Sequence, residues 1–124
     1  MSDGPDDHES AYELLQRGEV LLRDRHYAQA VVVLQRAASA EPGKGSILEA
    51  LGRAYFNSGQ AESARVTFVA LLELDPSAHY AHFGLGESLR RLGRRAEAGT
   101  HLRMAVALDP SSPLYRRALA RLRP

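Results

Sequence analysis

A set of three residues recurs every 34 positions along this chain of 124 residues. Each set holds a glycine, an alanine and a proline, and such self-similarity restricts a chain to architectures in which one structural unit stacks on the next. The three sets are Gly18, Ala30 and Pro42, then Gly52, Ala64 and Pro76, then Gly86, Ala98 and Pro110.

The residue types within each set predict a pair of packed helices. A glycine inside a helix costs about 1 kcal/mol relative to alanine, so its recurrence indicates a place where a second helix leaves no room for a side chain. The alanine that follows it is expected to be the small partner on that second helix. The proline ends the unit, because it lacks the amide donor and clashes with the preceding helical turn. We therefore expect stacked helical hairpins, an architecture typical of proteins that bind other proteins.

Apolar residues at three- and four-residue steps place the helices within each unit. The first helix is expected from Ser10 to near Arg25, and the second from Tyr27 to just before Pro42. The next two units repeat this pattern, with turns at 58–60 and 92–94, which gives six helices. A serine followed by Pro113 then predicts a seventh helix. Its apolar side would cover the last hairpin and its arginines would meet water, as a terminal cap requires.

Composition limits the class of protein further. Hydrophobic residues make up 44% and charged residues 25%, which is typical of a globular domain that lies outside the membrane. The apolar runs are far shorter than the roughly 20 residues that span a bilayer, so no membrane partner is expected. Residues 1–9 are acidic and lack an apolar stretch, so we expect a flexible leader, a domain at 10–124 and a cytoplasmic location. Cysteine is absent, so stability must come from packing.

Charge is distributed unevenly along the chain. Residues 1–62 hold six basic and ten acidic side chains, a net charge of −4, whereas residues 63–124 hold ten basic and five acidic ones, a net charge of +5. This asymmetry favours an acidic partner for the C-terminal half or head-to-tail self-association into a homo-oligomer. Solvated arginines spread by chance are the alternative explanation. The arginines clustered at 90–95 and 116–123 also permit nucleic-acid binding, which the near-neutral overall charge disfavours.

With units at 11–44, 45–78 and 79–112 and a closing helix at 113–123, the chain resembles the tetratricopeptide repeat (TPR) proteins. Three positions depart from the family pattern: Arg17 replaces a usual leucine, Arg25 replaces the turn glycine, and His82 takes a slot normally filled by a large apolar residue. The middle unit matches best, with Leu48, Leu51, Gly52, Tyr55, Gly59, Ala64, Phe68 and Pro76 where the family has them.

This resemblance implies an all-α, right-handed solenoid of three helix-turn-helix hairpins plus a seventh capping helix. It also implies a concave groove, lined by the first helix of each hairpin, that takes a peptide or helix of a partner protein. Phe56 and Phe83 could instead be partly buried between repeats. The groove residues implied for this chain are Tyr12, Leu15, Glu19, Leu22, Glu49, Arg53, Phe56, Asn57, Tyr80, Phe83, Glu87 and Arg90.

Other chemistry finds little support in the sequence. Family members that clamp the C-terminal carboxylate of heat-shock chaperones use basic and amide side chains, whereas the matching places here hold Leu15, Glu19, Ala50, Tyr80 and Gly84. His79 and His82 are suitably spaced for a metal but lack a convincing third ligand, so neither a metal nor a cofactor is expected. No phosphate-binding loop or nucleophile motif is present. The sequence therefore predicts a non-catalytic adaptor or scaffold, with structural self-assembly as the main alternative.

Overall fold

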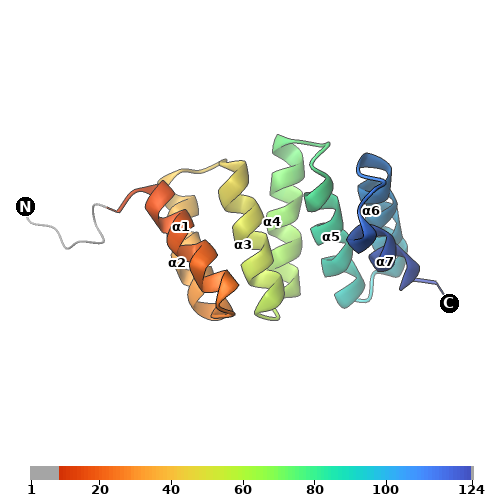
Figure 1. Ribbon diagram of the computed structural model, residues 1–124, viewed down its shortest axis with the longest axis horizontal. Coiled ribbons are helices and arrows are strands. Elements are labelled where there is room, and N and C mark those ends of the chain that lie inside the picture. Colours follow the sequence, from red (N-terminus) through yellow and green to blue (C-terminus); the bar gives the residue numbers. More distant parts are fainter. Residues whose placement is uncertain (1–8, 124) are drawn as a thin grey trace, which may run out of the picture.

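The computed structural model describes residues 9–123, and every regular element in that range is an α-helix. The helices follow one another in a row of three hairpins, with a seventh helix at the far end (Figure 1). This confirms the predicted all-α solenoid. The helices are α1 (Ala11–Arg23), α2 (Tyr27–Ala40), α3 (Gly45–Asn57), α4 (Ala61–Leu74), α5 (His79–Arg91), α6 (Arg95–Leu108) and α7 (Pro113–Ala120).

Side-chain caps define where the first and last helices begin. The Ser10 hydroxyl accepts a hydrogen bond from the Glu13 amide at 3.0 Å, and the Ser10 amide donates to the Glu13 carboxylate at 2.9 Å. This reciprocal pair satisfies two amides that have no partner within the helix. The Ser112 hydroxyl caps α7 in a similar way, with Pro113 at the first helical position. α7 ends at Ala120, three residues earlier than the sequence indicated.

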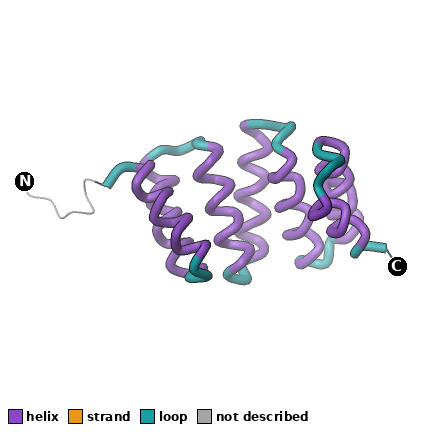
Figure 2. The backbone as a smooth tube through the Cα atoms, viewed as in Figure 1, coloured by secondary structure: helices purple, strands orange, loops and turns teal. Residues whose placement is uncertain are grey.

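Short turns connect the two helices of each hairpin (Figure 2). Each turn contains one residue with a left-handed backbone: Arg25 at φ 64°, Gly59 at 85° and Gly93 at 83°. Glycine adopts this conformation without the steric cost that a side chain adds. Arg25, which departs from the family pattern, therefore keeps the turn in the first hairpin at some cost in stability.

The three recurring glycines do lie where helices of one hairpin approach closely, as predicted. A Cβ atom on Gly52 would lie only 2.6 Å from the Phe68 ring, and one on Gly86 would lie 2.7 Å from Leu102. Gly18 faces Leu34 in the same way. The nearest side chains over the glycines are thus large ones from the second helix, which corrects the expectation that alanine side chains fill this role, although the Ala98 backbone oxygen also lies 3.2 Å from the Gly86 position. Ala30, Ala64 and Ala98 are fully buried one turn earlier.

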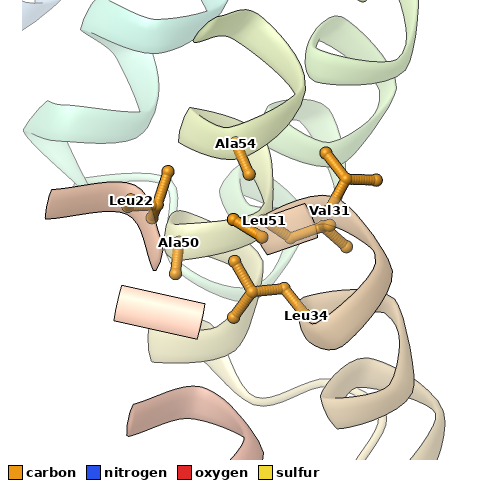
Figure 3. Close-up of a cluster of buried hydrophobic side chains, with 7 residues drawn as sticks. Leu22, Val31, Leu34, Ala50, Leu51 and Ala54 are labelled. Carbon is orange, nitrogen blue, oxygen red and sulfur yellow. The ribbon is translucent and has the colours of Figure 1, made fainter. Parts of the chain in front are cut away.

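The hydrophobic core consists of clusters that each span two neighbouring hairpins, and Tyr55 packs against clusters on both sides of the middle hairpin. Around α1, α2 and α3 the core consists of small and aliphatic side chains that interlock between the first two hairpins (Figure 3). Neither hairpin covers its own apolar face, so each depends on its neighbour for burial. The side chains in this cluster are Leu22, Ala30, Val31, Leu34, Ala50, Leu51 and Ala54.

The remaining departures from the family pattern also have a structural explanation. Arg17 points outward and forms a two-pronged ion pair with Glu9, at 2.8 and 3.0 Å. Glu9 was assigned to the flexible leader, yet it is packed against the domain; residues 1–8 of that leader lie outside the described range. His82 is 6% exposed, and its Nε2 lies 2.9 Å from the Pro76 carbonyl oxygen. None of the described helices has the length and hydropathy needed to cross a bilayer.

Candidate functional site

The first helices of the hairpins, together with α7, form one face of the molecule. α3 packs against both α1 and α5, and α5 packs against α7. Residues 34 positions apart consequently meet across this face, which we call the groove face. Glu87 on α5 and Arg121, just after α7, illustrate this, since their carboxylate and guanidinium lie 3.3 Å apart.

A cavity of about 210 Å³ opens between α3, α5 and α7 on the groove face. We call it the aromatic pocket. Its walls are mainly apolar, and it brings together six of the twelve groove residues implied by the sequence. The lining consists of Arg53, Phe56, Asn57, Tyr80, Phe83 and Glu87 from that set, together with Phe68, Gly84 and Leu114.

The rings around this pocket form a connected cluster. Tyr80 packs edge-on against Phe68 at 6.2 Å between ring centroids, and lies 5.6 Å from Phe83. Phe83 in turn stacks on Tyr115 of α7 at 5.2 Å. Burial raises the pKa of Tyr80 to about 12, with Arg53 opposing the shift and Glu49 adding to it. The Tyr80 phenol therefore stays neutral at physiological pH, and the ring cluster holds the pocket walls in place.

Glu87 is the charged residue buried most deeply in the pocket wall, at 5% exposure. Its Oε1 accepts hydrogen bonds from Arg90 at 2.9 Å and from Arg121 at 3.3 Å. Its Oε2 is buried too, but has no hydrogen-bond partner among residues 9–123. A buried carboxylate oxygen without a donor is costly, because its lost hydration is not replaced.

Several arginines near the groove face already have partners. Arg90 is held by Glu87, and the Arg91 guanidinium sits 4.2 Å from the centroid of the Phe56 ring. Arg94 pairs with Glu97 at 2.7 Å, and Arg116 donates to the Pro110 carbonyl oxygen at 2.8 Å. Most of the arginines clustered in the sequence therefore contact other groups of the same chain. Few of their guanidinium groups remain available to bind phosphates.

The other implied groove residues lie outside the aromatic pocket. Tyr12 and Leu15 line a separate cavity of about 280 Å³ between α1 and α3. Leu22 belongs to the core at 5% exposure, so a partner cannot reach it. Glu19 is exposed and Glu49 is partly exposed, and neither lines the aromatic pocket or the cavity beside Tyr12. Phe56 and Phe83 satisfy both interpretations of the sequence, since they are partly buried and also line the pocket.

Three residues that line the aromatic pocket were not predicted from the sequence. The sequence places Phe68 in the repeat pattern, Gly84 among the positions that match a carboxylate clamp, and Leu114 within the capping helix. The 34-residue spacing contains a signal for Leu114, which follows Tyr80 by one repeat length. The same spacing relates Arg53, Glu87 and Arg121, so the closing helix continues the groove face instead of only covering the core.

Three of the described histidines make contacts between helices. His79 Nδ1 lies 2.7 Å from the Tyr115 hydroxyl, which ties α5 to α7. His82 and His101 stack with their rings 5.3 Å apart and their Nδ1 atoms 3.1 Å apart. Within residues 9–123, no three or more His, Cys, Asp or Glu side chains gather in a way that could hold a metal ion.

Comparisons with known proteins agree with this geometry. The tetratricopeptide repeat family matches at residues 15–68 and 49–113. Superkiller complex protein 3 of Mus musculus is 32% identical over 94 residues, which cover 76% of this chain but 6% of that protein.

Two solved structures share the fold. The first TPR of Spaghetti (RPAP3), bound to the HSP90 peptide SRMEEVD, has a TM-score of 0.86 at 18% identity, over 91% of this chain and 90% of that one. The type III secretion chaperone SycD of Yersinia enterocolitica, in complex with a peptide of the translocator YopD, has a TM-score of 0.77 at 21% identity, over 90% and 85%. The repeated glycines, the stacked hairpins and the family match over most of its length together show that this chain belongs to the tetratricopeptide repeat family.

Proposed function

We propose that this chain is a non-catalytic interaction module that holds an extended peptide or a helix of a partner protein on its groove face. The aromatic pocket is the observation that carries this proposal. It lies on the face formed by the first helices, and it combines rings with charged and amide groups. Such a mixture suits protein recognition, because rings give a large contact area at low entropic cost while polar groups fix orientation.

Preorganisation is the physical basis of this activity. The ring cluster and the Glu87–Arg90–Arg121 ion pairs hold the pocket in shape before a partner arrives. A partner segment then loses its own conformational freedom but does not have to order the receptor. Structural neighbours such as RPAP3 and SycD, which were solved with bound peptides, support a protein-binding role for this fold.

The groove residues also argue against one type of peptide. Among the places where carboxylate-clamping relatives have basic and amide groups, this chain has the acidic Glu19 and the buried Ala50, which is 1% exposed. A C-terminal carboxylate would be repelled by the first and would find no donor at the second. The proposed partner segment is therefore an internal one. Its acidic character and a cytoplasmic location of the complex stay predictions of the sequence.

A displayed library of random peptides, selected on the full chain, tests the proposal. The best selected peptide is synthesised, and its affinity is measured for the wild type, for Arg53→Glu and for Arg103→Glu. Arg53 lines the pocket and has no ion-pair partner within residues 9–123, whereas Arg103 is exposed on α6. We expect Arg53→Glu to weaken binding about tenfold, or about 1.4 kcal/mol, and the control to leave it unchanged.

Two results would contradict the proposal. One is equal affinity of both variants, accompanied by amide chemical-shift changes that lie outside α3, α5 and α7. The other is a selection that yields no binding peptide. The same selection tests the acidic partner, because an excess of Asp and Glu among the selected peptides is expected if Arg53 and Arg121 attract them.

A further inference from the structure

The C-terminal end of the helix row carries a cavity that is separate from the aromatic pocket. α7 lies beside α6 at this end (Figure 1). A cavity of about 670 Å³ opens there, between the first half of α6 and the end of α7, and we call it the end cavity. None of the twelve groove residues implied by the sequence lines it. It is therefore a second surface on which a partner could be held.

The end cavity lies where α7 stops short. α3 packs on α2 and α5 packs on α4, and these two first helices have 13 residues each, whereas α7 has eight. With a rise of about 1.5 Å per residue, α7 is about 7 Å shorter than they are. The start of α6 consequently has less cover than the second helices of the preceding hairpins.

The end cavity also lacks an apolar side chain that the chain supplies in the preceding hairpin. Leu89 is 3% exposed there and belongs to one core cluster with Ala64 of α4. One repeat length later stands Arg123, which is exposed. Leu119 and Leu122 are left partly exposed in the cavity wall. An apolar side chain from a partner would bury them further, which is favourable in proportion to the area removed from water.

The rim of the end cavity is positively charged. Arg95, Arg103 and Arg123 line it, all three are exposed, and none of them forms an ion pair within residues 9–123. Arg95 donates to the Leu122 carbonyl oxygen, and the Arg103 guanidinium lies 3.5 Å from the Thr100 hydroxyl oxygen. Both of these oxygens are neutral, so they orient the guanidinium groups without cancelling their charge. Three like charges around one cavity favour a segment that carries carboxylates.

We infer that the end cavity binds an acidic segment of a partner protein, which places an apolar side chain on Leu119 and Leu122 and its carboxylates on the three arginines. A nucleic acid is a poorer match, because no aromatic ring lines the cavity for bases to stack on. Residues 1–8 of a second copy are a poorer match too, since they hold three aspartates but no leucine, isoleucine, valine or aromatic residue. This surface goes beyond the proposed function, which needs only the groove face.

Three short peptides, each acetylated and amidated at its ends, test the inference. Glu-Glu-Leu-Glu-Glu carries both features, Gln-Gln-Leu-Gln-Gln lacks the charges, and Glu-Glu-Gly-Glu-Glu lacks the apolar side chain. Each is titrated into the full-length chain labelled with ¹⁵N, and dissociation constants are taken from the amide shifts of Gly99, Thr100 and Leu122. We expect the first peptide to bind about tenfold more tightly than either of the others. Its affinity should fall as salt rises from about 0.1 M to about 1 M.

A pair of variants shows whether these peptides bind in the end cavity. Arg103→Glu and Arg117→Glu change the charge by the same amount, but Arg103 lines the cavity, whereas Arg117 is exposed on α7 and does not line it. We expect Arg103→Glu to weaken the acidic peptide about tenfold. Arg117→Glu should weaken it about twofold or less, because salt screens a charge that makes no direct contact. Circular dichroism and thermal melting verify that both variants fold.

The variants also separate this inference from the proposed function. A peptide in the aromatic pocket should lose affinity in Arg53→Glu and keep it in Arg103→Glu, whereas the acidic peptide should show the reverse. Failure of the groove peptides leaves the second pattern intact, and failure of the acidic peptide leaves the first.

Several results would overturn the inference. These are equal affinity of the charged and uncharged peptides, equal affinity of the leucine and glycine peptides, the same loss in both variants, or amide shifts confined to α3 and α5. Tighter binding of a single-stranded RNA oligonucleotide would assign the arginines to phosphates instead. A peptide of residues 1–8 that binds as tightly as the acidic peptide would assign the cavity to a second copy of this chain.

Discussion

Single residues decide how closely these helices pack. Phe68 is 1% exposed, and its ring occupies space left by two glycines on different hairpins: Gly52 on α3 and Gly84 on α5. A Cβ atom at either position would overlap the ring. One aromatic side chain thus packs within its own hairpin and against the next, which links the family's glycine pattern to the wall of the aromatic pocket.

Gly52→Ala is expected to destabilise the protein. Alanine favours the helix by about 1 kcal/mol, but forcing a methyl group against the buried Phe68 ring costs about 2–3 kcal/mol, so we expect a net loss of about 1–2 kcal/mol. The measurement is the midpoint of urea unfolding. Gly99→Ala is the control, because the nearest atom there is the mobile end of Arg103 at 3.2 Å, and this variant should be neutral or slightly more stable. Equal loss in both variants would contradict the packing argument.

The His82–His101 pair predicts how stability depends on pH. Burial first, and then the neighbouring His82, lowers the pKa of His101 below its usual 6.5, while Glu97 opposes the shift. The unfolded chain therefore binds a proton at a higher pH than the folded protein does. It follows that the stabilisation is complete above pH 6.5 and is lost as the pH falls from there through the folded pKa.

Urea unfolding at about pH 7.5 and about pH 5 measures this effect through the change in the free energy of unfolding. We expect the wild type to be less stable at the lower pH, and His101→Gln to lose part of that difference. The variant should leave the hairpin order intact, because His101 lies at the surface of α6 and is partly exposed. An unchanged pH dependence in the variant would mean that other groups are responsible.

At the scale of elements, α7 depends on its neighbours. It has eight residues, fewer than an isolated helix needs to be stable in water. Tyr115 attaches it to the array, since it is 4% exposed, stacks on Phe83 and bonds to His79. Leu114 on the same helix forms part of the pocket wall. The helix therefore serves both the core and the groove face.

Tyr115→Ala is expected to release α7 while the first two hairpins stay folded. Hydrogen exchange followed by NMR measures this, because amides of α7 should lose protection and those of α1–α4 should keep it. Tyr115→Phe is the matched control: it keeps the ring stack and loses only the hydrogen bond, so we expect a loss of about 1 kcal/mol without local unfolding. Equal protection of α7 in Tyr115→Ala would show that the ring is not its anchor.

At the scale of the whole molecule, residues 9–62 hold six basic and seven acidic side chains, a net charge of −1, and residues 63–123 a net charge of +5, and these two parts lie at opposite ends of the helix row (Figure 1). This arrangement would allow head-to-tail association, the alternative raised by the sequence. However, many of the charges are paired within the chain, as in Arg65–Glu62, Arg94–Glu97 and Arg90–Glu87. These paired groups are already included in the net charges, so the attraction between the ends is limited by the net charge of only −1 in residues 9–62.

Sedimentation velocity at low and high salt distinguishes a monomer from a head-to-tail assembly. The Debye length is about 10 Å at 0.1 M salt and about 3 Å at 1 M, so an assembly held by opposite charges should dissociate between these conditions. We expect a monomer in both, since residues 9–62 carry a net charge of only −1 with which to attract the positive end. A dimer or filament that disappears at high salt would instead support a self-assembling scaffold.

The sequence by itself determined the helices, their order and their pairing. The signals for these are local: apolar spacing, the serines before α1 and α7, and a glycine or proline at every helix boundary except the Arg25 turn. These signals identify the helices reliably because the same pattern occurs three times in the chain. Six of the implied groove residues also meet in the aromatic pocket, and their role in binding stays a prediction.

Only the tertiary structure decided how individual side chains are used. Leu22 joins the core, Arg90 is held by Glu87, and Phe68 reaches the pocket from α4 through the gap left by two glycines. These outcomes depend on residues from different hairpins meeting at particular distances. Periodicity states which residues share a face of a helix, but the stacking of one helix on another sets which of them are covered, paired or left open.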